Sequence, residues 1–231
     1  MEAVRVEIRA YTASFRIPGM MSYQVTSPVP PPSTIYGLLA AAMGREVTPE
    51  ETWIAYRCTY LAVQEDLEKI IIYDEKGPVW QKALYQPKTN VLRRQFLFEP
   101  RLTLYLQPGA VAEAFLRPRF PILLGRSQDV AYVESLTQAT LEPTEQAEMA
   151  GVLLPFPVAD PRMKSRLMSF PTFYPIAPGR RPRAVKPFHV IDGLSKNGTL
   201  KTEAVTVPDL LYKEINYSPL GVPLFDTRQL S

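Results

Sequence analysis

The sequence predicts an α+β fold, and three features of the chain predict it. Near the N-terminus, Val4, Val6 and Ile8 alternate with charged residues, which is the period of a half-buried strand. A helical run over 34–43 follows a proline-rich segment and stops before Gly44. Short runs of apolar and β-branched residues then recur along the rest of the chain. The order of these elements decides which α+β topology we expect.

The first helix is delimited by its neighbours in the sequence. Residues 17–32 are dense in proline, which excludes a regular helix because proline fixes φ and lacks an amide donor. Ser33 follows three prolines, so we expect its side chain to cap the helix. Thr48 and Glu51 form a capping-box pattern, which predicts a second short helix over about residues 49–55.

Strand-like runs and one more helical segment follow. The runs cover residues 56–64, 69–73, 90–98 and 101–107. Between the second and third runs, glycine, prolines and several lysines predict a long protruding hairpin or loop. Residues 109–117 have helical composition, and 120–124 form a short apolar run. The order β-α-(α)-β-β-β-β-α-β contains the elements of a ferredoxin-like domain with an inserted hairpin.

We therefore expect a ferredoxin-like domain over residues 1–127, with its hairpin at about 74–100, and a second lobe over 128–231. The second lobe is punctuated by prolines, and no helical pattern in it persists beyond about two turns. It should therefore be rich in β-structure and loops. Its apolar runs lie at 152–154, 204–207 and 222–225.

Composition excludes several classes of protein. With 231 residues and 46% apolar content, the chain can bury a substantial core. No apolar run reaches the roughly 18 residues of a membrane helix, and the N-terminus lacks the pattern of a signal peptide. We expect a soluble, cytoplasmic protein without a membrane partner. Cys58 is the single cysteine, which excludes an intrachain disulfide and a cysteine-based zinc site. No motif predicts a cofactor or a metal.

The distribution of charge says more than the net charge of +3. One stretch without any acid, between Asp160 and Asp192, contains Arg162, Lys164, Arg166, Arg180, Arg181, Arg183 and Lys186. Another, between Glu75 and Glu99, contains Lys76, Lys82, Lys88, Arg93 and Arg94. Two such basic islands are typical of a polyanion-binding surface, and the alternative is a pair of solvated loops. In the later island, we expect an extended, poorly self-stabilised segment in which Arg180, Arg181, Arg183 and Lys186 contact nucleic acid.

Two segments carry a resemblance to a known family. The first is Phe15-Arg16-x-Pro18, followed by Thr26 and by the PPPSTIYGLL run over residues 30–39. The second is FPILLGRS over residues 120–127. Together they resemble the Cas-five family, which belongs to the RAMP superfamily of CRISPR proteins.

The resemblance implies a ferredoxin-like (RRM/RAMP) domain with a β-hairpin thumb. It also implies binding to the 5′ handle of crRNA in a type I Cascade complex used in antiviral defence or RNA-guided targeting. The partners that it implies are the Cas-seven backbone subunit and the Cas-eight large subunit, with target DNA met indirectly within the complex.

Three candidate RNA-binding residues lie in the first matching segment. Ser33 and Thr34 stand at a predicted helix N-terminus, where free amides and the helix dipole favour a phosphate. The alternative is that they only cap the helix. Arg16 follows the first strands and can pair with a phosphate or with an acidic side chain.

The second matching segment contributes Arg126 and Ser127. Arg126 follows Gly125 at a strand end, where a backbone without a side chain can approach a ligand and a guanidinium can grip a phosphate. The alternative is a salt bridge from Arg126 to Asp129 or Glu134.

In the predicted thumb, aromatic residues and cations interleave as they do in proteins that bind single strands. The RNA-binding candidates there are Trp80, Lys82, Lys88, Arg93 and Arg94. Arg93 and Arg94 are adjacent, so in a strand they face opposite sides and at most one should address RNA.

Catalysis is not expected, although one enzymatic alternative stays open. His189 is the single histidine, and a metal-independent endoribonuclease that processes CRISPR repeat RNA could use it or a tyrosine as base, with Lys186 as electrostatic partner. A scaffold that contacts only protein is the third possibility. The main hypothesis is a binding module that holds the crRNA handle and caps the foot of the complex.

Overall fold

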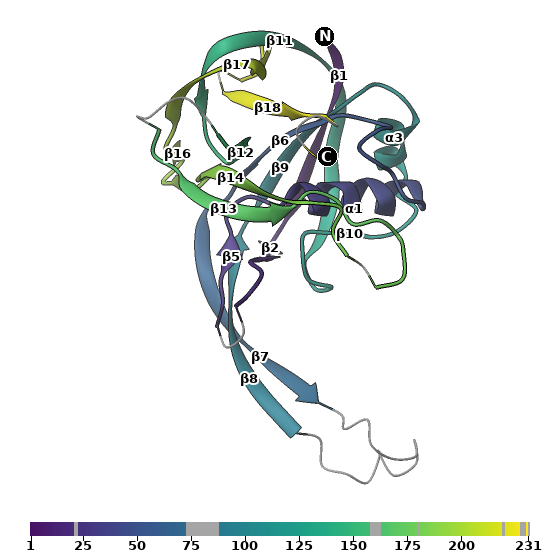
Figure 1. Cartoon of the computed structure of the whole chain (residues 1–231), viewed down its shortest axis with the longest axis vertical. Helices are drawn as coiled ribbons and strands as arrows, with labels where there is room; N and C mark the ends of the chain where they lie inside the picture. Colours follow the sequence, from purple (N-terminus) through teal and green to yellow (C-terminus); the bar gives the residue numbers. More distant parts are fainter. Residues whose placement is uncertain are drawn as a thin grey trace.

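The computed structural model describes residues 1–20, 23–72, 88–157, 163–179, 181–218, 220–226 and 230. It is dominated by strands, which account for 55% of the structure against 10% for helices. Its centre is a six-stranded antiparallel sheet that closes on itself into a barrel (Figure 1). None of the helices in the described ranges is long and apolar enough to span a membrane.

The barrel is a ring of six strands in which every neighbouring pair is antiparallel. In order around the ring they are β1 (Glu2–Ala10), β9 (Arg101–Leu106), β6 (Ile54–Thr59), β18 (Gly221–Phe225), β17 (Glu203–Glu214) and β11 (Val130–Met149). The ring closes because β11 pairs with β17 over its second half and with β1 over its first half. The short strand β10 (Ile122–Leu123) adds to the edge of β11.

The predicted ferredoxin-like fold is wrong. That fold needs two helices, but the second candidate, over 109–117, forms only α3 (Ala110–Glu113) and a 3₁₀ turn over Ala114–Leu116. The helix predicted over 49–55 is a turn, and β6 begins at Ile54. The sheet is instead closed by β11, a strand of 20 residues that is long enough to pair with strands on both sides.

The first predicted strand and the first predicted helix are both present. Burial alternates along β1, as its apolar period indicates. The helix, α1, covers Pro32–Met43 and ends at Gly44, which has a φ of 75° and donates its amide to Ala40 at 2.8 Å. Ser33 is not its cap, because the N-cap is Pro31 and Pro32 occupies the first helical turn, where its fixed φ suits a helix.

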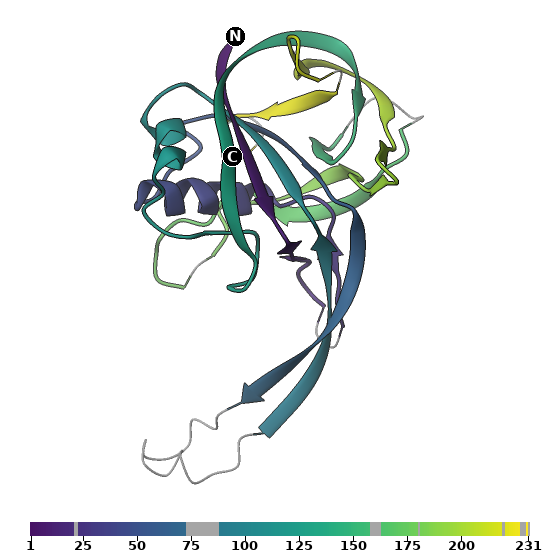
Figure 2. The same cartoon turned by 180° about the vertical axis from the view of Figure 1, so that it is seen from behind.

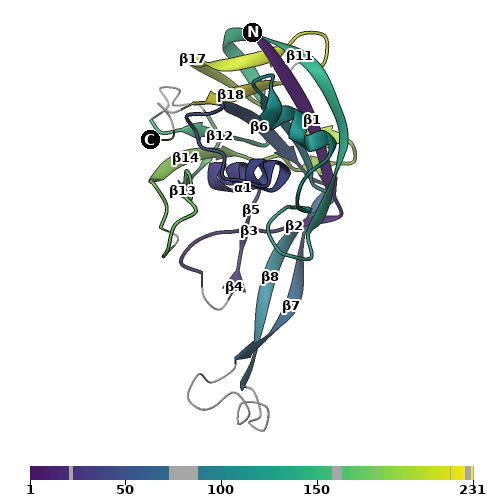
Figure 3. The same cartoon turned by 90° about the vertical axis from the view of Figure 1, so that its right-hand side faces the viewer.

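The larger apolar core lies on the outer face of the barrel. It joins residues from β1, β6 and β9 to the buried side of α1 and to a three-stranded sheet. That sheet has the order β12 (Val152–Pro155), β14 (Val185–Ile191) and β13 (Arg166–Pro171). The ring centroids of Phe170 and Phe188 in the sheet lie 6.3 Å apart, and Phe188 packs edge-on against Phe225 of the barrel with 6.1 Å between centroids. Figure 3 shows α1 between this sheet and the barrel.

A long hairpin extends away from the barrel (Figures 1 and 2). It consists of β7 (Ala62–Ile72) and β8 (Lys88–Phe98), paired antiparallel along their whole length. The part of the predicted hairpin over 73–87 lies outside the described residues. Smaller strands pair at the base: β2 (Thr12–Ala13) and β4 (Tyr23–Gln24) with β8, and β3 (Phe15–Arg16) with β5 (Thr26–Ser27). A turn pairs β15 (Ser195–Lys196) with β16 (Thr199–Leu200).

The inner face of the barrel carries charged groups beside its small apolar residues. Arg5 and Glu214 form an ion pair of 2.5 Å, and Tyr105 donates to the other oxygen of Glu214 at 2.9 Å. The ring of Tyr217 lies over the Arg5 guanidinium, with 3.4 Å between the carbon and the ring centroid. These charges can be buried because each one has an opposite partner and hydrogen bonds.

Candidate nucleic-acid interface

A groove of about 670 Å³ lies at the base of the hairpin. Its lining residues come from β3, the start of α1, the loop after β10 and the end of β13: Ser14, Phe15, Arg16, Pro18, Gly19, Pro31, Ser33, Thr34, Gly125, Pro171 and Tyr174. It adjoins the hairpin because Ser14 donates to the carbonyl of Gln95 in β8 at 2.9 Å. No acidic residue is among the described residues that line it. The groove therefore suits an anionic ligand.

Arg16 is the cation of this groove. The strand β3 turns Phe15 into the core, where it is 2% exposed, and leaves Arg16 exposed. The amide of Phe15 donates to the hydroxyl of Thr26 at 2.9 Å, which fixes the position of β3. Within the part of the chain that the structure describes, no acidic side chain pairs with Arg16. Its guanidinium can therefore bind a phosphate.

Ser33 and Thr34 stand in the first turn of α1 and are half-buried in the same groove. The amide of Thr34 donates to Pro31 at 2.9 Å. Neither hydroxyl makes a side-chain hydrogen bond with a described residue. The two hydroxyls and the positive end of the helix dipole thus face a groove that also contains Arg16. The structure brings these three predicted residues together.

Gly125 lines the groove, but close packing explains why it is glycine. Its φ is 113°, and an added Cβ would lie 2.0 Å from the carbonyl oxygen of Ser14. Ser14 donates its amide to Leu124 at 3.1 Å, so the two backbones cross in contact. A side chain at this position would push the loop away from β2 and β3.

Arg126 is held by an acid, which is one of the two alternatives that the sequence left open. Its Nε and Nη2 donate to the two oxygens of Asp129, each at 2.9 Å. The Arg126 side chain is 10% exposed and that of Asp129 is fully buried. The neighbouring Ser127 is exposed in the turn. The binding of RNA by Arg126 and Ser127 stays a prediction.

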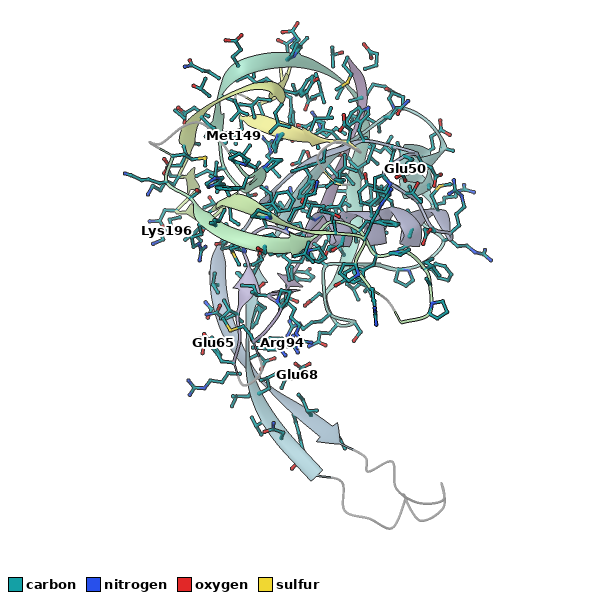
Figure 4. All side chains as sticks on the ribbon, viewed as in Figure 1. Glu50, Glu65, Glu68, Arg94, Met149 and Lys196 are labelled. Atoms are coloured by element: carbon teal, nitrogen blue, oxygen red, sulfur yellow. The ribbon has the colours of Figure 1, made fainter. Side chains whose placement is uncertain are left out.

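The hairpin candidates divide between the two faces of β8. Arg94 pairs with Glu68 at 2.5 Å on one face (Figure 4), and Arg93 is exposed on the other. No ion pair joins Arg93 to a described residue, so it is the available cation of this pair. Trp80 and Lys82 lie outside the described residues, as does the side chain of Lys88.

The later basic island is more firmly anchored than expected. Phe170 and Phe173 are buried in the core, and Phe173 packs edge-on against Tyr36 of α1 at 5.7 Å. Arg183 pairs with Glu50, and the backbone of Ile176 is bound by Glu46. The buried Phe170 and Phe173 thus stabilise the island, where the sequence predicted a poorly self-stabilised segment.

The predicted contacts of this island do not gather at one place. Arg181 is exposed, Lys186 is half-buried on β14, and Arg180 lies outside the described residues. Tyr174, which lines the groove beside Arg16, is a residue that sequence reasoning did not select. The feature of the sequence that could have selected Tyr174 is its position among the cations of the later basic island.

His189 is bound to a hydroxyl rather than to an acid. Its Nδ1 lies 2.8 Å from Oγ of Ser165, its Nε2 is buried without a described partner, and burial lowers the pKa of the imidazole. Lys186 is three residues away on β14 and therefore points to the opposite face. The two side chains therefore lie on opposite faces of β14, and the enzymatic alternative stays a prediction. Among the described residues, no group of histidine, cysteine and acidic side chains could hold a metal ion.

Several solved structures of CRISPR proteins are similar to this chain at low identity, and the one with a TM-score above 0.5 shows the same fold. A chain of the "Type III-B Cmr-beta bound to cognate target RNA and AMPPnP" has a TM-score of 0.52 at 12% identity, over 82% of this chain and 84% of that one. A chain of a "CRISPR RNA-guided surveillance complex" has a TM-score of 0.48 at 17% identity, over 90% and 91%. A CRISPR protein from Archaeoglobus fulgidus has 0.49 at 11% identity, over 96% and 99%.

No curated protein matches the sequence. A family model does match it, over residues 3–183, and its description is CRISPR-associated protein (Cas_Cas5). This match includes both segments from which the resemblance was inferred, and it confirms that inference. The chain belongs to the CRISPR-associated Cas_Cas5 family.

Proposed function

We propose that this chain is the crRNA-binding subunit that holds the 5′ handle of the guide RNA and caps the foot of a type I CRISPR Cascade effector complex, without catalysis. In that complex it contacts the Cas-seven backbone subunit and the Cas-eight large subunit in the cytoplasm, and meets target DNA only indirectly. The observation that carries the proposal is the groove that joins Arg16 to the first turn of α1, in which no described lining residue is acidic.

The groove and the hairpin contact different parts of the RNA in this proposal. Phosphates of the handle lie against Arg16 and the hydroxyls of Ser33 and Thr34, because all three donate hydrogen bonds and none is neutralised by a described acid. Tyr174, 36% exposed, offers a ring on which a splayed base can stack. Arg93, which is exposed on β8, adds a cation on the hairpin.

The test is the affinity of the purified chain for RNA that carries the repeat-derived handle of its own CRISPR array, measured by fluorescence anisotropy. Arg16→Ala should weaken binding roughly tenfold or more, the effect of losing one charge-assisted hydrogen bond. It should also reduce the salt dependence by about 0.7 in the log-log slope. Arg117→Ala is the matched control, since Arg117 is also exposed but does not line the groove.

The other two hypotheses give different results in the same samples. Cleavage of labelled repeat RNA without metal, lost in His189→Ala, would replace the proposal with the endoribonuclease. Failure of the wild-type chain to bind handle RNA at any salt concentration would support a scaffold that contacts only protein. Equal affinity of wild type and Arg16→Ala would remove the groove from the RNA site.

A further inference from the structure

The outer edge of β11 is open between the two strands that pair with it. On that side, β10 pairs only with Val130 and Ala131, and β17 begins its pairing at Leu141. The other side of β11 is occupied by β1 over the whole interval. Residues 132–139 therefore have a strand neighbour on one edge only, within the part of the chain that the structure describes.

The alternation of hydrogen bonds shows which backbone groups face this open edge. The amide of Leu141 donates to the carbonyl of Met1 at 2.8 Å. The odd-numbered residues just before Leu141 therefore direct their backbone amides and carbonyls toward β1. Thr140 points the other way, and its carbonyl accepts from Ile215 at 3.1 Å. By the same parity, Leu136 and Gln138 direct their amides and carbonyls outward. A bulge at Glu134 shifts the pairing with β1 by one residue. On the N-terminal side of this bulge, the backbone groups of Val133 therefore face outward, as those of Ala131 do.

A groove of about 680 Å³ lies beside this edge. One wall is β11 from Ala131 to Leu136, and the other is the segment from Phe115 to Ile122. Three large apolar side chains on its walls are more than half exposed: Leu116 at 66%, Phe120 at 55% and Tyr132 at 54%. Figure 2 shows β11 along one side of the barrel with α3 beside it. Natural sheet edges are normally covered or blocked by charge, so such an edge beside exposed apolar residues indicates a binding surface.

We propose that this edge accepts an extended segment of another protein subunit, which adds to the barrel as a strand beside β11. Its backbone pairs with Val133, Leu136 and Gln138, and apolar side chains at alternate positions contact Leu116 and Phe120. The groove is separate from the RNA groove, since the two share no lining residue. The proposal therefore does not depend on the binding of the handle.

Charge and backbone chemistry define the occupant. Glu134 is already paired with Arg9 at 2.6 Å, whereas no described acid pairs with Arg119 in the wall or with Arg117 next to it. The remaining charge is positive, so the added segment should carry an acidic residue opposite these arginines. A nucleic acid could use the arginines, but its phosphates only accept hydrogen bonds and would leave the outward carbonyls of β11 unpaired. A polypeptide strand satisfies both amides and carbonyls.

Hydrogen exchange in the chain alone and in the assembled effector complex tests the added strand directly. Amides at Val133, Leu136 and Gln138 should exchange at least about tenfold more slowly in the complex. The internal reference is the stretch 142–148, whose edge is already paired with β17 and should change little. Fast exchange of the three amides in the complex would overturn the proposal, and this measurement needs no variant that might fail to fold.

A photo-crosslinking benzophenone residue in place of Phe120 identifies the occupant. Irradiation of the assembled complex should join it to a segment of another protein subunit, located by mass spectrometry. The matched control is the same residue in place of Leu167, which is 57% exposed on β13. Crosslinks to RNA, or none in a complex that contains all subunits, would overturn the proposal.

The exposed wall can also be changed without touching the RNA groove. Phe120→Glu should reduce incorporation of the chain into the complex at least about tenfold, while leaving handle RNA affinity unchanged. Leu167→Glu should assemble as wild type does. Normal assembly of a folded Phe120→Glu chain would contradict the proposal, whereas loss of RNA binding with normal assembly in Arg16→Ala concerns the handle site alone.

Discussion

Arg126 and Asp129 form a bidentate ion pair that closes the loop between β10 and β11. The backbone amide of Arg126 donates to the same carboxylate at 3.0 Å, and the hydroxyl of Thr12 donates to it at 2.6 Å. The hydrogen bond to Asp129 raises the pKa of the Arg126 guanidinium. A carboxylate without solvent contact thus accepts from four donors, and the loop that borders the groove of Arg16 depends on that carboxylate.

Asp129→Ala should lower the free energy of unfolding by about 3 kcal/mol, because it leaves the largely buried Arg126 without its partner. Urea denaturation followed by circular dichroism measures this change. Glu134→Ala is the control: its ion pair with Arg9 is exposed by more than a third on both sides and should be worth little. A loss as small as the control's would show that Arg126 finds another partner.

Gly125→Ala should destabilise the chain by about 3 kcal/mol or more. The new Cβ would lie 2.0 Å from the Ser14 carbonyl oxygen, and alanine is strained at a φ of 113°. Gly198→Ala separates the two causes, since Gly198 has a φ of 78° with open space around it and should cost roughly 1–2 kcal/mol. Equal effects of the two substitutions in thermal or urea unfolding would contradict the close approach at Ser14.

Stability should fall as the pH drops below about 6.5, and His189 should cause part of that fall. Burial lowers the pKa of His189 in the folded chain, so the unfolded chain binds the proton more readily. The stability from the neutral imidazole is present above the unfolded pKa and is lost as the pH falls through the folded one. His189→Gln removes the single histidine and should flatten unfolding free energy between about pH 5 and pH 7. An unchanged slope would mean that carboxylates alone cause it.

Arg93→Ala and Arg94→Ala should differ in their effect on RNA. Arg93 is exposed and has no described ionic partner, so its loss should weaken binding of handle RNA roughly tenfold. Arg94 is held by Glu68, so its loss should change RNA affinity little. Anisotropy titrations at one salt concentration measure the RNA affinities of both variants and of the wild type. The reverse order of affinities would place the RNA on the other face of the hairpin.

The elements that the sequence predicted well are those in which burial produces a strong local pattern. In β1 the buried positions that face the larger core are Val4, Val6 and Ile8, so the period of two is obvious. In β11 the most buried positions include Ala131, Ala139 and Ala147. Their small side chains differ little in hydrophobicity from the polar residues between them, so no period stands out in the sequence. The longest strand was therefore missed, and with it the closure of the barrel.

Closure itself is not a local property. It depends on the pairing of β1 with β11 and of β18 with β6, which are far apart in the chain, and a hydrophobic pattern does not specify such partners. The Ala-rich composition of segment 109–117 predicts a helix, but its second half tightens into a 3₁₀ turn before Arg117 and Pro118.

At the site, the family segments selected Arg16, Ser33 and Thr34, which share one groove, and their binding of RNA stays a prediction. The sequence could not decide the partner of Arg126, since both an acid three residues away and a phosphate were compatible with its position. It also could not find Tyr174, because Tyr174 reaches the groove through the packing of Phe173 on Tyr36. Contacts of that kind follow from tertiary structure, and the position of Tyr174 among the cations of the island does not specify them.

The closed ring has a kinetic consequence for synthesis on the ribosome. Strand β18 ends at Phe225 and pairs with β6, which ends at Thr59, so the ring cannot form until the chain has been made as far as Phe225. Until then β6 and β11 expose edges that β18 and β17 will later occupy. Such non-local pairing slows folding and favours aggregation of the nascent chain. Slower translation or a chaperone should therefore raise the yield of active protein more than stabilising the finished barrel would.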